Sequence, residues 1–258
     1  MADGASRASG DILDAVMPFL RRYGRALSGC RQTGDHLAYR AKQTARPHIS
    51  AVSVRAIRID LFRTLNLIWQ HPPTTTFSQV AARNRMRQVS PCTREALLLR
   101  TIEEFDFNDI AYILDTHPDD VPDLFETAIQ EIPYRSRKRI LLLEDDVLIA
   151  MDMANCVSEM GCIVSGVART AAQAIEMGRE MPPELIIAST ELADGSSGWD
   201  AVSALQTLYP GLDAVFVSPY PERFLTGRDA EPVFIIAKPC FDDHVRSVVS
   251  QCFILSGA

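Results

Sequence analysis

Several patterns are absent from this sequence of 258 residues, and each absence argues against a class of protein. No apolar run approaches the roughly 20 residues that cross a membrane as a helix. The six cysteines form no CxxC pair and the five histidines are scattered, so the spacing of a zinc site is missing. The first residues lack a cationic flank followed by a long apolar stretch, so we predict no secretory signal and expect a cytoplasmic protein.

Motifs of catalysis are missing as well. The sequence contains no Walker loop, no recognisable pair of nucleophile and base, and no cluster of metal-ligating residues. We therefore expect a protein that acts by binding, not an enzyme.

Positive charge is missing from one long stretch, because residues 101–134 contain no Lys or Arg. The net charge is −7, but it is unevenly distributed. Residues 1–100 hold 16 Lys and Arg against six Asp and Glu, whereas residues 136–258 hold nine against 17. A basic block followed by acidic blocks indicates separate modules with separate partners.

The first 70 residues have helical periodicity. Residues 11–29 place apolar side chains on one side, and Pro18 is expected to kink this helix or delay its start. A second amphipathic helix is predicted over 50–69, with its apolar face formed by Val54, Ile57, Leu61, Leu65 and Ile68. We assign residues 1–70 to one helical domain and residues 71–85 to a linker rich in turn-forming residues.

A second helical domain is predicted over 86–132. Ser90 before Pro91 is typical of a helix start, because serine caps and proline fits the first turn. Asn108 is expected to cap a short helix, and Pro122 fits the first turn of another helix capped by Asp119 or Asp120. Helix, short turn and helix is the layout of a helix-turn-helix domain.

This second domain has the wrong charge for DNA binding. A DNA reader must place cations against phosphates, because phosphate contacts dominate the affinity. The predicted recognition helix and its turn instead carry Asp119, Asp120, Asp123 and Glu126. This favours a protein partner, but a DNA-binding transcriptional regulator or sigma factor stays open as the alternative because of Arg83, Arg85 and Arg87.

The chain changes its periodicity after a basic hinge at 133–138. Over 139–258, five short apolar runs, expected to be strands, alternate with predicted helices at 147–160, 170–181 and 199–208. The five runs lie at 140–146, 161–168, 184–189, 213–218 and 232–238. This alternation predicts an α/β domain with a five-stranded parallel sheet covered on both faces. The ligand site of such a sheet lies at the carboxyl ends of its strands, which here carry Glu144, Asp145, Ser189, Ser218 and Lys238.

These strand ends resemble the response-regulator receiver family. ILLLEDD supplies the acidic pair Glu144 and Asp145, VFVS ends in Ser218, and IIAKP supplies Lys238. The stretches TELADGSSGWDA and SPYPERFLTG further resemble the PhyR subfamily, the general stress response regulators of alphaproteobacteria. In that subfamily an amino-terminal domain imitates regions two and four of a sigma factor, which correspond to residues 11–69 and 86–132 here.

The resemblance implies partner switching. A phosphorylated receiver releases the sigma-like domain, which sequesters a NepR-type anti-sigma factor and so frees the true sigma factor. A histidine kinase would supply the phosphoryl group. The expected function is therefore that of an anti-anti-sigma factor.

The resemblance also assigns roles in the receiver pocket. Ser189 stands where the family has its phosphoacceptor aspartate, and a serine hydroxyl is a weak nucleophile without a general base. Ser218 would be the switch hydroxyl, and Lys238 would contact the phosphate. Glu191 falls where a backbone carbonyl binds the metal, and Asp194 lies in a loop where we expect a role in turn geometry.

The metal-binding capacity of this pocket stays open at the level of sequence. Glu144, Asp145 and Glu191 could hold Mg²⁺, weakened by loss of the acceptor carboxylate, because hard cations prefer oxygen ligands. Equally, Glu144 and Asp145 could be a remaining acidic patch neutralised by Lys238. We predict that the receiver is not phosphorylated by the usual route, and both a natural and an introduced serine at 189 are compatible with the sequence.

Overall fold

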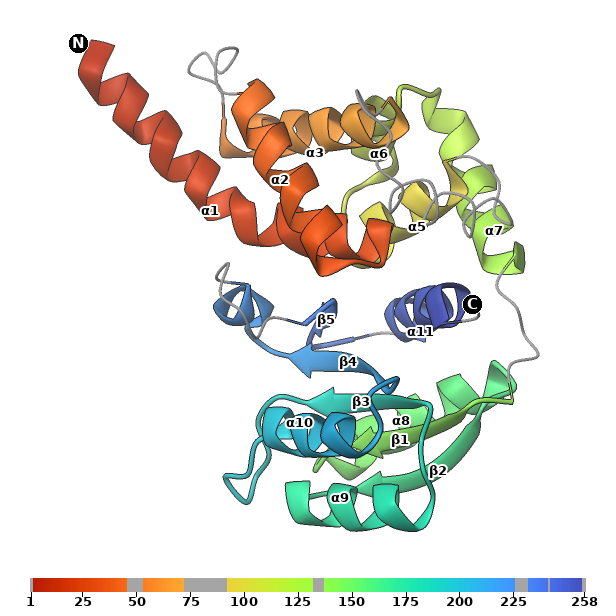
Figure 1. Ribbon diagram of the computed structural model, residues 1–258. Helices are drawn as coiled ribbons and strands as arrows, with labels where there is room; N and C mark the ends of the chain where they lie inside the picture. Colours follow the sequence, from red (N-terminus) through yellow and green to blue (C-terminus); the bar gives the residue numbers. More distant parts are fainter. Residues whose placement is uncertain are drawn as a thin grey trace. The chain divides into compact units, whose positions relative to one another are not determined.

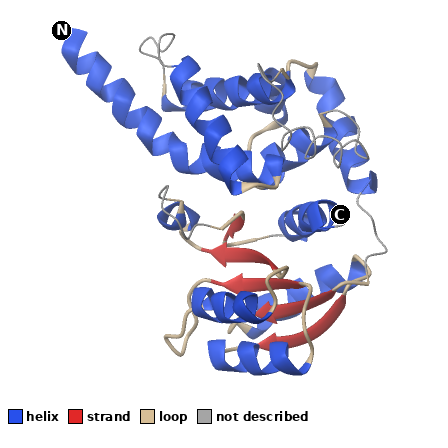
Figure 2. Cartoon of the chain, viewed as in Figure 1, coloured by secondary structure: helices blue, strands red, loops and turns tan. Residues whose placement is uncertain are grey.

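The structure is a computed structural model that describes residues 2–45, 53–71, 92–131, 137–225, 232–240 and 242–256 (Figure 1). The chain divides into two compact units, one formed mainly by Met1–Glu131 and the other by most of the chain beyond it. We call them the helical unit and the sheet unit. Figure 2 shows the first built from helices and the strands gathered in the second. None of the described helices is long and apolar enough to cross a membrane.

The helical unit contains six described α-helices and one short 3₁₀ helix. They are α1 (Ala2–Ser28), α2 (Arg31–Ala45), α3 (Val54–Gln70), α5 (Thr93–Thr101), α6 (Phe107–Leu114), the 3₁₀ helix Pro118–Asp120 and α7 (Val121–Glu131). The linker predicted over 71–85 and the hinge over 133–138 lie largely outside the described residues, as do Ser90, Pro91 and the arginines at 83, 85 and 87.

Helix α1 differs from its prediction because it begins at Ala2 and runs through Pro18 without a late start. Its apolar side is buried, and this burial offsets the backbone hydrogen bond that a proline removes. Helix α2, which we did not predict, packs closely on α1 through two glycines. A Cβ atom on Gly34 would lie 2.3 Å from the backbone nitrogen of Arg25. The buried Arg25 guanidinium also donates to both carboxylate oxygens of Asp35, at 2.6 and 2.8 Å.

Helix α3 confirms the predicted amphipathic helix with one correction. Ile57, Leu61 and Leu65 are buried as expected. Val54 is 57% exposed, so its assignment to the apolar face is wrong. The reason is its position: Val54 is the first residue after the N-cap Ser53, where the helix is only beginning to pack.

The second helical group also follows its prediction in outline. Helix α6 is capped by Asp106 and not by Asn108, because the Asp106 side chain accepts a hydrogen bond from the Asp109 backbone nitrogen at 2.8 Å. Pro122 does lie in the first turn of α7. The predicted aspartate cap is wrong, since both candidate residues belong to the 3₁₀ helix that leads directly into α7.

The sheet unit is a five-stranded parallel sheet with helices on both faces, as predicted. Its elements are β1 (Arg139–Leu143), α8 (Val147–Glu159), β2 (Ile163–Ala168), α9 (Ala171–Glu180), β3 (Leu185–Ser189), α10 (Gly198–Leu208), β4 (Asp213–Ser218), the 3₁₀ helix Pro221–Phe224, β5 (Phe234–Ala237) and α11 (Asp242–Ser256). The strand order is β2-β1-β3-β4-β5. Helix α11 was not among the predicted elements.

The register of the sheet brings the strand ends together. Leu143 of β1 pairs with Ala188 of β3, and Ser189 pairs with Val217 of β4. Ser218 in turn pairs with Ala237 of β5. Since all these strands are parallel, the residues that follow them emerge at one edge of the sheet.

Candidate functional site

Three side chains meet at the carboxyl edge of the sheet. Ser189 ends β3 and is 3% exposed, and Glu144 directly follows β1 and is 2% exposed. Lys238 directly follows β5, and its ammonium group donates to the Ser189 hydroxyl at 3.1 Å. The same ammonium group forms an ion pair with Oε2 of Glu144. The fold thus joins strands β1, β3 and β5 through one lysine.

The Glu144 carboxylate is fully engaged by this arrangement. Its Oε1 accepts from the backbone nitrogen of Asp146 at 3.2 Å, while its Oε2 is held by Lys238. An opposite charge beside a buried carboxylate removes much of the penalty for burying it. The ammonium group of Lys238 therefore already supplies the positive charge that the pocket needs.

The other acidic candidates face different groups. Asp145 accepts from the backbone nitrogen of Ala193 at 3.2 Å. The Glu191 side chain is exposed, but its backbone carbonyl accepts from the Ser189 hydroxyl at 3.1 Å. Asp194 accepts from the hydroxyl and the backbone nitrogen of Ser196, and these hydrogen bonds lower the pKa of its carboxyl. Asp194 therefore shapes the loop, as its sequence context suggested.

Ser218 ends β4 beside this cluster and is buried. Its hydroxyl accepts from the backbone nitrogen of Tyr220 at 3.1 Å, in the turn that follows the strand. Pro219 lies between them and restricts the backbone of Ser218. The predicted switch hydroxyl is therefore oriented by its own turn.

Gly198 is a residue of this site that sequence reasoning did not single out. It begins α10, and a Cβ atom there would lie 2.0 Å from the carbonyl oxygen of Ser189. Only glycine permits this close approach of the helix to the end of β3. The next residue, Trp199, stacks on Phe216 of β4 with ring centroids 3.8 Å apart. A glycine beside the Ser197 cap was the available signal.

The carboxylates at this edge of the sheet are already engaged by other groups, which disfavours a divalent cation. Among the described residues, no group of three or more His, Cys, Asp or Glu could hold a metal ion. At the pocket itself, a cation would have to displace Lys238 from Glu144 and compete for an oxygen of Asp145 that already accepts from Ala193. Mg²⁺ keeps near-ideal octahedral geometry and dehydrates reluctantly, so it gains little from ligands that are already paired.

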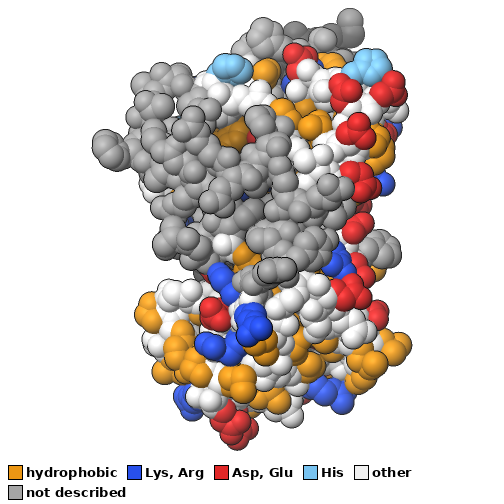
Figure 3. Space-filling model, turned by 90° about the vertical axis from the view of Figure 1, so that its right-hand side faces the viewer, with side chains coloured by type: hydrophobic (Ala, Val, Ile, Leu, Met, Phe, Trp, Pro, Cys, Tyr) orange, Lys and Arg blue, Asp and Glu red, His pale blue; other side chains and the backbone are white. Residues whose placement is uncertain are grey.

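The helical unit presents a second feature, an acidic surface. Exposed carboxylates lie between α6 and α7 and in the first half of α7. They belong to Asp115, Asp119, Asp120, Asp123 and Glu126. Figure 3 shows acidic side chains gathered on this face. In a helix-turn-helix this is where a DNA reader would carry cations, so the charge of this surface is opposite to that of a DNA-binding surface.

Comparisons with known proteins match both parts of the helical unit. Residues 13–66 match the family model described as the Sigma2 domain of PhyR. Residues 86–134 match the model for the response regulator PhyR, sigma-like domain.

Full-length relatives match nearly the whole chain. The phyllosphere-induced regulator PhyR of Methylorubrum extorquens is 39% identical over 243 residues, which cover 91% of this chain and 90% of the relative. The crystal structure of the response regulator PhyR from Brucella abortus is 31% identical, covers 92% of this chain and 90% of its own, and has a TM-score of 0.77. A variant of the anti-anti-sigma factor PhyR from Bartonella quintana is 28% identical, covers 96% and 99%, and has a TM-score of 0.82. On this evidence the chain belongs to the PhyR family of response regulators, which combine sigma-like helices with a receiver sheet.

Proposed function

We propose that this chain is an anti-anti-sigma factor of the general stress response. Its helical unit binds a NepR-type anti-sigma factor and thereby releases the sigma factor that NepR restrains. PhyR of Bartonella quintana, to which the chain is similar over almost its full length, is described as an anti-anti-sigma factor. PhyR of that organism has also been crystallised in complex with the anti-sigma factor NepR.

The observation that carries this proposal is a sigma-like fold with an acidic surface. The part of the chain that imitates a DNA-reading helix-turn-helix exposes Asp119, Asp123 and Glu126. A protein that competes with a sigma factor for its inhibitor needs the sigma shape but no affinity for DNA. The acidic surface supports protein binding over the alternative of a promoter-binding regulator.

We further propose that the receiver works without aspartyl phosphate. Ser189 occupies the acceptor position, and its hydroxyl is held between Lys238 and the Glu191 carbonyl. The ammonium group of Lys238 forms an ion pair with Glu144 and donates a hydrogen bond to that hydroxyl, so Lys238 is a poor general base for activating it. In this proposal a histidine kinase transfers no phosphoryl group to the chain, and Mg²⁺ is not a resident cofactor.

Calorimetry with a purified NepR-type protein tests the partner. We expect saturable binding by the full chain, and we expect no shift of a promoter fragment in a gel assay at physiological salt. Promoter binding without NepR binding would contradict the proposal and favour the transcriptional regulator.

Phosphorylation assays test the receiver separately. We expect no acid- and base-labile label after incubation with acetyl phosphate and Mg²⁺, or with a histidine kinase. A label mapped to any carboxylate, including Glu191 or Asp194, would show that aspartyl or glutamyl phosphate chemistry persists.

A further inference from the structure

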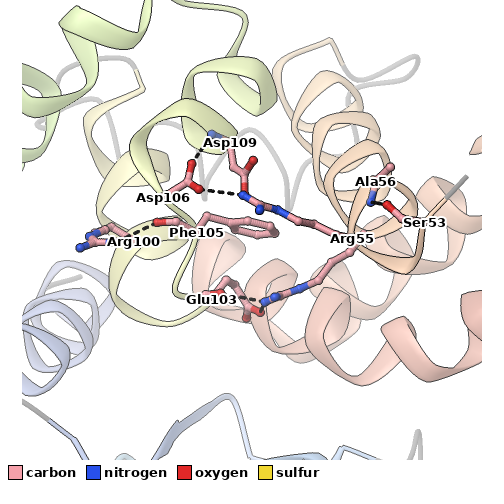
Figure 4. Close-up of polar contacts among 9 residues, drawn as sticks. Ser53, Arg55, Ala56, Arg100, Glu103, Phe105, Asp106 and Asp109 are labelled. Carbon is pink, nitrogen blue, oxygen red and sulfur yellow. Dashed lines mark hydrogen bonds and ion pairs between the residues drawn. The ribbon is translucent and has the colours of Figure 1, made fainter.

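One arginine of helix α3 forms ion pairs with two acids at the start of helix α6. The Arg55 guanidinium donates to Asp106 at 2.7 Å and to Asp109 at 2.8 Å (Figure 4). Asp106 is the N-cap of α6, and the hydrogen bond from the Asp109 backbone nitrogen, helped by Arg55, lowers the pKa of its carboxyl. Asp106 is therefore ionised at neutral pH and pairs with the positive charge of Arg55.

A second arginine of α3 contacts the other end of α6. Arg63 donates to the Tyr112 carbonyl and, at 2.7 Å, to the carboxylate of Asp115, the C-cap of α6. Its guanidinium also lies 4.6 Å from the centre of the Tyr112 ring. Arg55 and Arg63 are eight residues apart, which is about 12 Å along a helix, and α6 has eight residues. The segment of α3 from Arg55 to Arg63 therefore runs along α6 in the same direction, from its N-cap to its C-cap.

A buried ion pair lies beside this contact. Arg58 of α3 donates to the carbonyl of Glu103 at 2.7 Å and to its carboxylate at 3.3 Å. The other oxygen of this buried carboxylate accepts from Arg22 of α1 at 2.9 Å. The Arg58 guanidinium lies 4.5 Å from the Phe105 ring centre. We call the paired side chains of α3 and of the α6 region the clasp: Arg55, Arg58, Arg63, Glu103, Asp106, Asp109 and Asp115.

The clasp joins two modules of the helical unit. The three arginines of α3 lie within the part that matches the Sigma2 domain of PhyR, whereas Glu103 and α6 lie within the part that matches its sigma-like domain. Building on the proposed function, we propose that the clasp is an autoinhibitory contact. The arginines of α3 form ion pairs with the acids of α6 and so keep both from a partner. The anti-sigma factor binds the form in which the outer pairs, those of Arg55 and Arg63, are broken.

The ion pairs of the clasp compete with ion pairs to a partner. An arginine that already donates hydrogen bonds to two carboxylates binds a further acidic group on a partner only weakly. Those carboxylates likewise bind a basic group on a partner only weakly. The outer pairs are exposed to solvent, so each contributes little and is weakened by salt. They can therefore open reversibly while the buried pair of Glu103 keeps the fold. A ligand that binds only the open form loses affinity in proportion to the closed fraction.

Arg55→Gln and Arg63→Gln in the full chain test this contact. We expect each variant to bind a NepR-type protein about two- to fivefold more tightly, the change that follows from losing the one exposed pair of Arg63 or the two of Arg55. Arg40→Gln in α2 removes the same charge outside the clasp and controls for net charge. Asp109→Asn removes one of the two pairs of Arg55 and should act in the same direction but more weakly, because the pair with Asp106 remains. The double variant should gain less than the sum of the two, because Arg55→Gln already breaks the pair with Asp109.

Hydrogen exchange of the α6 amides gives a measurement that does not need the partner. We expect faster exchange in Arg55→Gln and Arg63→Gln, and faster exchange of the unaltered chain as salt is raised. Unchanged or weaker NepR binding by both variants would overturn the autoinhibitory role. If the unaltered chain binds no NepR, the proposed function fails instead, and α6 exchange that is indifferent to salt and to both substitutions would overturn the clasp on its own.

Discussion

Replacing Ser189 by aspartate is the sharpest test of the receiver pocket. The substitution puts a second carboxylate beside Glu144, at a position that is 3% exposed. Lys238, 3.1 Å from the Ser189 hydroxyl, would then be shared by two buried carboxylates. A buried polar group without its full set of partners costs about 1–3 kcal/mol, and the larger cost of a charged group is partly offset here by the shared Lys238. For a unit of this size, about 1 kcal/mol lowers the Tm by about 4 °C, so we expect a fall of about 4–12 °C in EDTA.

Magnesium should reverse this loss. The added carboxylate supplies the anionic ligand that the pocket lacks, and Mg²⁺ would offset the excess negative charge. A ligand that binds only the folded state contributes about 2.7 kcal/mol when it is present at 100 times its Kd. Thermal unfolding of Ser189→Asp, followed by circular dichroism, should therefore recover most of the lost Tm in MgCl₂. Ser189→Asn, which has the same shape without the charge, is the control.

Two results would refute this reasoning. One is an equal Tm of Ser189→Asp in EDTA and in MgCl₂, and the other is an equal response of the asparagine control. We also expect Mg²⁺-dependent phosphate incorporation by Ser189→Asp. This incorporation should leave NepR affinity largely unchanged, because the Ser218 hydroxyl is held by the Tyr220 backbone nitrogen and cannot readily turn to a phosphate.

Three further outcomes are expected. Gly198→Ala should destabilise the sheet unit by about 1–3 kcal/mol, because its Cβ atom would lie 2.0 Å from the last carbonyl oxygen of β3. Gly211→Ala is the control, since its Cβ atom would meet no atom within 4 Å, and it should lower the Tm far less in thermal unfolding. Glu103→Gln should cost about 3–5 kcal/mol in urea unfolding, because it leaves the buried Arg22 guanidinium without its carboxylate, and a loss below about 1 kcal/mol would contradict this. Residues 1–132 alone should bind NepR more tightly than the full chain in calorimetry, since the basic first 100 residues and the acidic carboxyl-terminal half favour mutual association. Equal affinities would mean that the receiver does not inhibit.

The sequence by itself determined the five strands of the sheet unit, its helices α8, α9 and α10, and the residues at its edge. Apolar runs of strand length alternate with helical periodicity, and only a parallel sheet covered on both faces buries such runs. The order of the strand ends then places Glu144, Ser189 and Lys238 at one edge, before any coordinate is known. The amphipathic helix α3 was equally readable, because Ile57, Leu61 and Leu65 repeat with the period of a helix.

Only the tertiary structure decided how these side chains pair. Lys238 and Glu144 are 94 positions apart in the chain, and Arg55 and Asp109 are 54 apart, so no local pattern specifies either contact. The requirement for Gly198 likewise depends on where α10 meets β3. The buried face of helix α2 consists of glycine and alanine apart from Leu37, so its apolar signal in the sequence is weak. Periodicity reports the burial of an element, whereas the partner of each charge depends on packing between elements that lie far apart in the sequence.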